Sequence, residues 1–67
     1  MRAGHRFIIE CLGVANEALH QAQLTAQHLG DAELAALCHE RSIEVVRMIG
    51  KIVKEEIEIK HAQERPS

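Results

Sequence analysis

Apolar residues recur along the chain at the three- and four-residue intervals of amphipathic helices, and they fall into two long stretches. Both stretches are rich in Ala, Leu, Gln, Glu and Lys, which are good helix formers. The pattern predicts one helix over about residues 5–29 and a second over about 32–63, joined by a turn at residues 30–31. We therefore expect an all-α fold in which residues 1–67 form a single helical-hairpin domain.

The predicted turn, Gly30-Asp31, has the residue types of one helix end followed by another helix start. Gly readily takes the left-handed conformation that closes a helix C-terminus. Asp is a preferred N-cap, because its carboxylate accepts hydrogen bonds from the free amides of the next turn. A connection this short makes the two helices antiparallel neighbours.

On the first helix, the residues expected to be buried share one arc at 100° per residue. Small Ala alternates there with larger Leu and Ile, which predicts a close antiparallel contact with the second helix. Asn16 and other polar residues fall on the opposite side, where Ile9 and Leu24 are the apolar exceptions. The residues of the predicted buried arc are Phe7, Ile8, Cys11, Leu12, Val14, Ala15, Ala18, Leu19, Ala22, Ala26 and Leu29.

On the second helix, the apolar arc covers about half of the circumference, which is more than one neighbouring helix can cover. Each large apolar side chain left in water forgoes roughly 1.5–3 kcal/mol, so a lone hairpin would lose more than the net stability of a typical domain. We expect a symmetric dimer of hairpins that forms a four-helix bundle, with larger assemblies left open. The expected interface residues are Leu34, Cys38, Val45, Val46, Met48, Ile49, Ile52, Val53, Ile57 and Ile59, with Ala15 and Ala22.

The end of the second helix extends about two turns beyond the start of the first. Ile57 and Ile59 alternate there with charged residues, a pattern that also fits a short strand, although the flanking residues favour helix. If this segment is helical, the two isoleucines are candidates for a contact with another protein, as are Ile9 and Leu24.

Composition narrows the classes of function. The chain has 67 residues, one Phe, no Tyr or Trp, two cysteines and a formal charge of −2. This balance gives no basic field for nucleic acid, two cysteines are too few for a disulfide scaffold, and no apolar run approaches the roughly 18 residues of a membrane span. The start of the chain is too short and too polar for a signal peptide. We expect a cytoplasmic protein with no nucleic-acid or membrane partner.

Cys11 and Cys38 both fall on the faces predicted to be inward. One interpretation is that each thiol packs as a small apolar group. The other follows from the rise of 1.5 Å per residue: in an antiparallel dimer about 40 Å long, Cys38 of one chain would lie level with Cys11 of the other. Such neighbours could form a disulfide on oxidation or hold a soft metal such as Cu(I).

Other chemistry is poorly supported. No two of the five histidines are three or four residues apart, so none forms the one-face pair of a helical metal site. Glu56 is the one carboxylate within the apolar arc, and it has no predicted inward partner for acid–base catalysis. There is no glycine-rich phosphate loop, Cys-x-x-Cys pair or nucleophile elbow. We expect no enzyme and no cofactor; a metal site would have to rest on Cys11, Cys38 or Glu56.

From about Leu12 to Glu56 the chain resembles the two-helix half of ferritin-like four-helix bundles. The resemblance implies a hairpin that pairs with a second hairpin and, in metal-binding members, a di-iron site of inward Glu and Glu-x-x-His residues. Glu17-Ala18-Leu19-His20 has that spacing but lies opposite the apolar arc, and Glu40 and Glu44 also miss it. The residues that carry the resemblance are Gly30-Asp31-Ala32-Glu33-Leu34-Ala35-Ala36-Leu37, followed by Glu40, Arg41, Glu44 and Val45.

The chain is also similar to the Rop class of RNA-regulating hairpin dimers in its length, central turn and alternation of small and large core layers. That resemblance implies RNA binding by the first helix, whose only cations are Arg2 and Arg6, whereas phosphate neutralisation needs several Lys or Arg together. We expect a non-catalytic protein that acts through homo-oligomerisation and protein–protein interaction. The alternative is a ferritin-like bundle that binds iron or copper.

Overall fold

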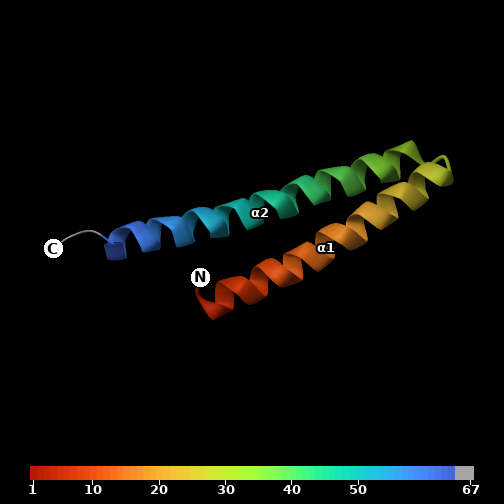
Figure 1. Cartoon of the computed structure of the whole chain (residues 1–67). Coiled ribbons are helices and arrows are strands. Elements are labelled where there is room, and N and C mark those ends of the chain that lie inside the picture. Colours follow the sequence, from red (N-terminus) through yellow and green to blue (C-terminus); the bar gives the residue numbers. More distant parts are fainter. Residues whose placement is uncertain (65–67) are drawn as a thin grey trace.

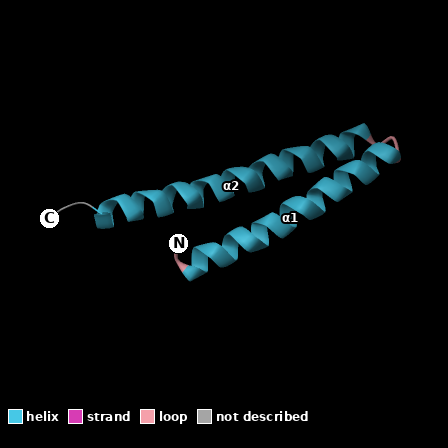
Figure 2. Cartoon of the chain, viewed as in Figure 1, coloured by secondary structure: helices cyan, strands magenta, loops and turns pink. Residues whose placement is uncertain are grey.

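The computed structural model describes residues 1–64, which form two α-helices, α1 (Ala3–His28) and α2 (Ala32–Glu64). The helices run side by side in opposite directions (Figure 1) and are joined by a short loop (Figure 2). The described residues contain no strand, so the segment from Glu56 to Lys60 is helical. The all-α hairpin is confirmed, and its dimensions of 59 × 17 × 10 Å make it a thin, two-helix slab.

The turn closes one helix and opens the next through hydrogen bonds of the backbone and of Asp31. Gly30 has a φ of 76°, the left-handed conformation that glycine adopts without strain. The Asp31 N–H donates to the Ala26 carbonyl at 2.9 Å and the Gly30 N–H to the Gln27 carbonyl at 3.1 Å, which is the Schellman pattern. The Asp31 carboxylate then accepts the Leu34 N–H at 3.0 Å and caps α2.

The two helices meet along one line of residues, which we call the seam. Seam residues alternate at intervals of three and four along each helix, which is the 3.5-residue repeat of a coiled coil. The most buried side chains all belong to it: Ala26, Ala35, Val45 and Cys38, at 2–9% exposure. The seam consists of His5, Ile9, Leu12, Asn16, Leu19, Gln23 and Ala26 of α1, and of Ala35, Cys38, Ser42, Val45, Ile49, Ile52, Glu56 and Ile59 of α2.

The seam on α1 corrects the predicted buried arc. Leu12, Leu19 and Ala26 lie in the seam, but so do Ile9 and Asn16, which the arc placed on the polar side. The remaining members of the arc are exposed, namely Phe7, Ile8, Cys11, Val14, Ala15, Ala18, Ala22 and Leu29.

Two physical reasons account for this difference. The apolar arc of α1 is wider than the contact that a single helix makes, so α2 can pack against either edge of it. The edge that is used holds the large side chains of Ile9, Leu12 and Leu19. It also places Asn16 opposite Ser42, whose hydroxyl lies in the α2 seam and needs a hydrogen-bond partner.

Candidate functional site

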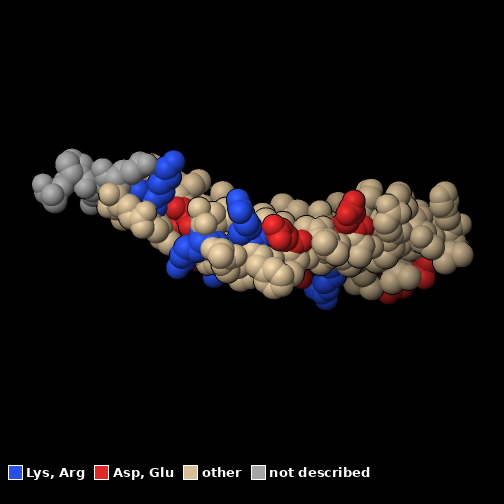
Figure 3. All heavy atoms as spheres, turned by 60° about the horizontal axis from the view of Figure 1, so that its bottom comes forward, with Lys and Arg blue, Asp and Glu red and all other residues tan. Residues whose placement is uncertain are grey.

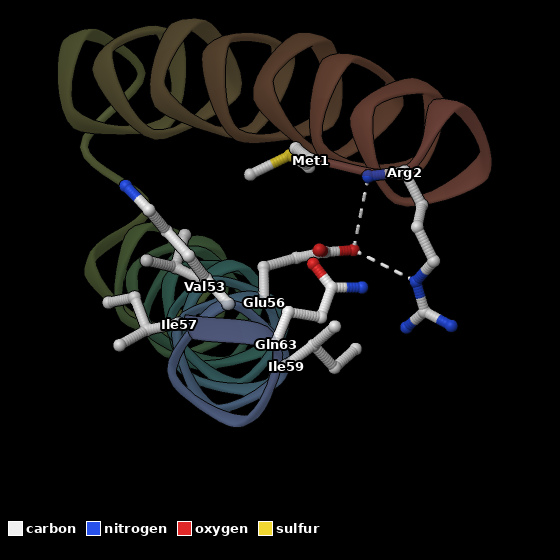
Figure 4. A pocket seen from close by; sticks show the side chains of 8 residues that line it. Met1, Arg2, Val53, Glu56, Ile57, Ile59 and Gln63 are labelled. Carbon is white, nitrogen blue, oxygen red and sulfur yellow. Dashed lines mark hydrogen bonds and ion pairs between the residues drawn. The ribbon is translucent and has the colours of Figure 1, made fainter. Parts of the chain in front are cut away.

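A cluster of polar side chains surrounds Glu56, where α2 passes the start of α1 (Figure 4). Glu56 Oε1 accepts hydrogen bonds from the Arg2 backbone N–H at 3.3 Å and from Arg2 Nε at 3.1 Å. The same oxygen contacts His5 Nδ1, and Arg2 Nη2 lies 3.2 Å from the His5 ring nitrogens. The side chain of Glu56 is only 11% exposed, so this carboxylate is held between the two helices.

Opposing effects act on the pKa of the Glu56 carboxyl. Burial between the helices raises the pKa, whereas the hydrogen bonds from Arg2 and His5 and the positive charge of Arg2 lower it. The lowering effects are the stronger together, and the pKa lies below its ordinary value. Glu56 is therefore ionised at neutral pH and joins the start of α1 to α2.

Glu56 has polar partners in the structure, although the sequence predicted no inward partner for acid–base catalysis. Arg2 and His5 precede Glu56 by 54 and 51 residues, so no local spacing could pair them with it. A signal was nevertheless present, because His5 falls on the same 3.5-residue repeat as Ile9 and Leu12. Extending that repeat to the start of α1 places His5 opposite Glu56.

Beside Glu56 lies an open pocket of about 410 Å³ (Figure 4). Met1, Val53, Ile57 and Ile59 supply most of its apolar lining. The Glu56 side chain points across the pocket toward Arg2, and its Oε1 is already engaged there. The pocket is thus a depression of the α2 surface next to a satisfied ion pair.

The residues considered for metal binding are not brought together. Cys38 is buried in the seam, whereas Cys11 is exposed on α1, and both thiols are free. This finding corrects the prediction that Cys11 faces inward. Within residues 1–64, no three His, Cys, Asp or Glu side chains gather as a metal site requires. His20, His28, His39 and His61 are exposed.

The larger candidate site is a surface. Six residues of α1, each directly before a seam residue, and Leu29 just after the helix repeat at alternating intervals of three and four, and all are exposed. None is charged. We call this set the α1 stripe: Ile8, Cys11, Ala15, Ala18, Ala22, Thr25 and Leu29.

A second exposed row runs along α2. Its large members are exposed by 38–54%, and each of them follows a seam residue by one position in the sequence. We call this set the α2 stripe: Ala36, Ile43, Val46, Gly50, Val53 and Ile57, with His39 at the repeat position between Ala36 and Ile43.

The two stripes lie on opposite broad faces of the hairpin. Residues of the α1 stripe directly precede seam residues, whereas residues of the α2 stripe directly follow them, so each stripe is turned about 100° from the seam. Because the two helices are antiparallel, preceding residues on α1 and following residues on α2 lie on opposite sides of the plane that contains both helix axes. Accordingly Ala36 lines a depression with Gln27 of α1, which follows the seam residue Ala26. The face of the α1 stripe also carries Leu34, Leu37 and Met48 of α2.

The expected interface residues divide among these surfaces. Cys38, Val45, Ile49, Ile52 and Ile59 lie in the seam, where α1 covers them at least in part. The others are exposed: Ala15 and Ala22 on the α1 stripe, Val46, Val53 and Ile57 on the α2 stripe, and Leu34 and Met48 of α2 on the α1-stripe face.

No helix in the described part of the chain combines the length and apolar character needed to cross a membrane. Comparison of the chain with protein-family models, curated proteins and solved structures found no match. The resemblances to ferritin-like and Rop-like hairpins therefore stay predictions.

Proposed function

We propose that this chain is a non-catalytic helical hairpin that acts by associating with copies of itself into a helical bundle. The observation that carries the proposal is the imbalance between buried and exposed apolar groups. Within residues 1–64, the buried side chains are Ala26, Ala35, Cys38 and Val45, none larger than valine.

Much larger groups remain in water on the single hairpin. On the α1 stripe Leu29 is exposed by 77% and Ile8 by 44%, and the α2 stripe adds further Ile and Val side chains. Full burial of one such side chain contributes about 1.5–3 kcal/mol. Covering even a few of them would match the whole net stability of a small domain, which favours association over a solitary hairpin.

Single exposed apolar residues are ordinary on protein surfaces, but continuous rows are not. Each stripe extends over most of a helix with the 3.5-residue repeat that helices use to pack against other helices. A helical partner is therefore the type of partner that both surfaces suit, and a copy of the chain is the simplest source of one.

Light scattering on the native chain tests this proposal. We expect a mass of twice 7.5 kDa or a higher integral multiple at micromolar concentrations, with dissociation on dilution. A folded chain of 7.5 kDa over the whole accessible range would contradict it. Elemental analysis of protein purified without a chelating tag tests the alternative, since a metal-binding bundle should carry stoichiometric iron, copper or zinc.

A further inference from the structure

We propose that a second copy lies antiparallel across the face that carries the α1 stripe, related to the first by a two-fold axis near Ala18. This inference rests on the self-association proposed above, and it specifies the surface and the orientation. Its partner is a whole second hairpin rather than a single helix.

The α1 stripe is nearly symmetric from end to end. Its largest side chains, Ile8 and Leu29, stand at its two ends, and small residues lie between them. A two-fold axis requires such symmetry, because each surface must be its own complement. Around Ala18, the antiparallel pairs are Ile8 with Leu29, Cys11 with Thr25, and Ala15 with Ala22.

The same axis also suits α2. Because His5 faces Glu56 across the seam, Ala18, thirteen residues after His5, is level with Ile43, thirteen residues before Glu56. On the α1-stripe face, Arg41 and Glu44 flank that level and pair within one chain at 2.9 Å. The axis brings the Arg41 of each copy beside the Glu44 of the other. It also brings Leu37 near Met48.

The charged residues of the α1-stripe face favour the antiparallel orientation. The α1 stripe itself has no charge, whereas Arg41, Glu44, Lys51 and Glu55 of α2 directly precede seam residues and so lie on this face. Figure 3 shows Lys and Arg together with Asp and Glu over the half of the hairpin away from the turn. Antiparallel stacking places α2 over the α2 of the other copy, so that Arg41 can meet Glu44, whereas parallel stacking would place α2 over the uncharged α1 stripe.

The available area indicates that the whole face is used. At 1.5 Å per residue, the 26 residues of α1 span about 39 Å. Over the 17 Å width of the hairpin, that length gives a footprint of roughly 660 Å². Stable interfaces bury about 800 Å² of accessible surface per partner, and accessible area exceeds the flat footprint. One helix about 10 Å wide would cover only about 60% of that footprint.

Substitutions at two adjacent residues test whether the α1-stripe face, rather than another side of α1, forms the interface. Ala15→Glu adds a charge on the α1 stripe, and the matched control Val14→Glu adds the same charge one position away, on the back of α1. Both sites are exposed in the hairpin, so circular dichroism should show both variants helical. We expect Ala15→Glu to raise the dimer dissociation constant on the order of 10-fold or more, because the dimer buries two unpaired charges. Val14→Glu should leave it within about twofold.

Cross-linking tests the orientation. With Cys11→Ser in the background, Ala18→Cys places a thiol next to its own copy at the axis and should give a disulfide-linked dimer after mild oxidation. Cys11→Ser alone should give none. The native chain should not link through Cys11 either, because the two Cys11 residues are about 21 Å apart along the helices.

The outcomes distinguish the two proposals. A native chain that is monomeric throughout contradicts self-association itself. A native dimer that survives Ala15→Glu, or that fails to cross-link through Ala18→Cys, leaves self-association standing and overturns this interface. A disulfide through native Cys11 would overturn the antiparallel orientation.

Discussion

Ser42 and Asn16 face each other in the middle of the seam, and the Ser42 hydroxyl donates a hydrogen bond to the Asn16 side-chain carbonyl. Polar pairs between apolar layers lower stability but determine which residues can face each other. His5 and Glu56 form a second such pair near the open end of the hairpin. The two polar pairs therefore fix the register of α1 against α2 at two separate levels.

The Asn16–Ser42 pair gives the first prediction. Replacing Ser42 by Ala leaves the Asn16 amide without its partner in a partly buried position, and we expect a loss of about 1 kcal/mol in the free energy of unfolding. The double change Asn16→Leu with Ser42→Ala removes both polar groups. It should be neutral or more stable than the native chain by about 1 kcal/mol. Urea denaturation at one fixed protein concentration measures both.

A control is Thr25→Ala, compared with Ser42→Ala in the Ala15→Glu background, because Thr25 belongs to the α1 stripe and must be free of a second copy. It removes an exposed hydroxyl that donates to the Gln21 carbonyl within α1. Because water can replace that bond, its loss should cost much less than the loss of the Ser42 bond. Equal effects of Ser42→Ala and Thr25→Ala would contradict the special role of the seam pair.

Glu56 gives a prediction about pH. Its folded-state pKa is lowered below the ordinary value of 4.5, so its contribution to stability is present above that value and is lost as the pH falls through the lowered pKa. We expect native protein to be more stable than Glu56→Gln at pH 7, and the difference to shrink as the pH is taken below 4.5 toward 2. Thermal melts of both chains across this range supply the measurement.

Glu10→Gln is the appropriate comparison, because Glu10 is exposed on α1. Its melting temperature should follow that of the native chain across the pH range. A difference in melting temperature between native protein and Glu56→Gln that stays constant from pH 7 to pH 2 would contradict the prediction. It would show that the ionised Glu56 carboxylate is not the source of the stability difference.

The helical hairpin was predictable because its signals are local. Gly30 and Asp31 mark the turn through their own backbone and side-chain preferences, and the 3.6-residue pattern marks the helices. The seam was not predictable, because α1 is apolar over a wide arc. Which edge of that arc packs against α2 depends on residues of α2. Asn16 is unfavourable in a seam until Ser42 lies opposite, and Glu56 has no partner until the register brings His5 and Arg2 to it.

Gly30 lies in the turn with a positive φ, whereas Gly50 lies within α2, so the same substitution at both positions tests backbone strain. Gly30 has a φ of 76°, so a methyl group there meets conformational strain although no atom lies within 4 Å. We expect Gly30→Ala to lower the free energy of unfolding by about 1–2 kcal/mol. Chemical denaturation at fixed protein concentration measures the change.

The same substitution in α2 should act in the opposite sense. Gly50 lies within the helix with open space around its added methyl, so Gly50→Ala should raise stability by about 0.5–1 kcal/mol. This expectation holds when the partner lies on the α1-stripe face, because Gly50 is on the other face. A loss of stability at Gly50→Ala that grows with protein concentration would instead place a partner on the α2 stripe.

The two thiols give a final prediction that links folding to association. Cys38 is buried in the seam, so a thiol reagent should reach it only when the hairpin opens. Cys11 is exposed on the single hairpin but lies on the α1 stripe, so association should cover it. We expect the modification rate of Cys11 to fall as protein concentration rises through the dimer dissociation constant, measured in a Cys38→Ser variant whose fold is checked by circular dichroism. The modification rate of Cys38, measured in a Cys11→Ser variant, should be slow at all protein concentrations and rise in denaturant.

Ala15→Glu supplies the control for Cys11. In the Ala15→Glu background the protection of Cys11 should disappear. A Cys11 rate that is independent of concentration, in a chain that light scattering shows to be dimeric, would mean that the copies meet on another face.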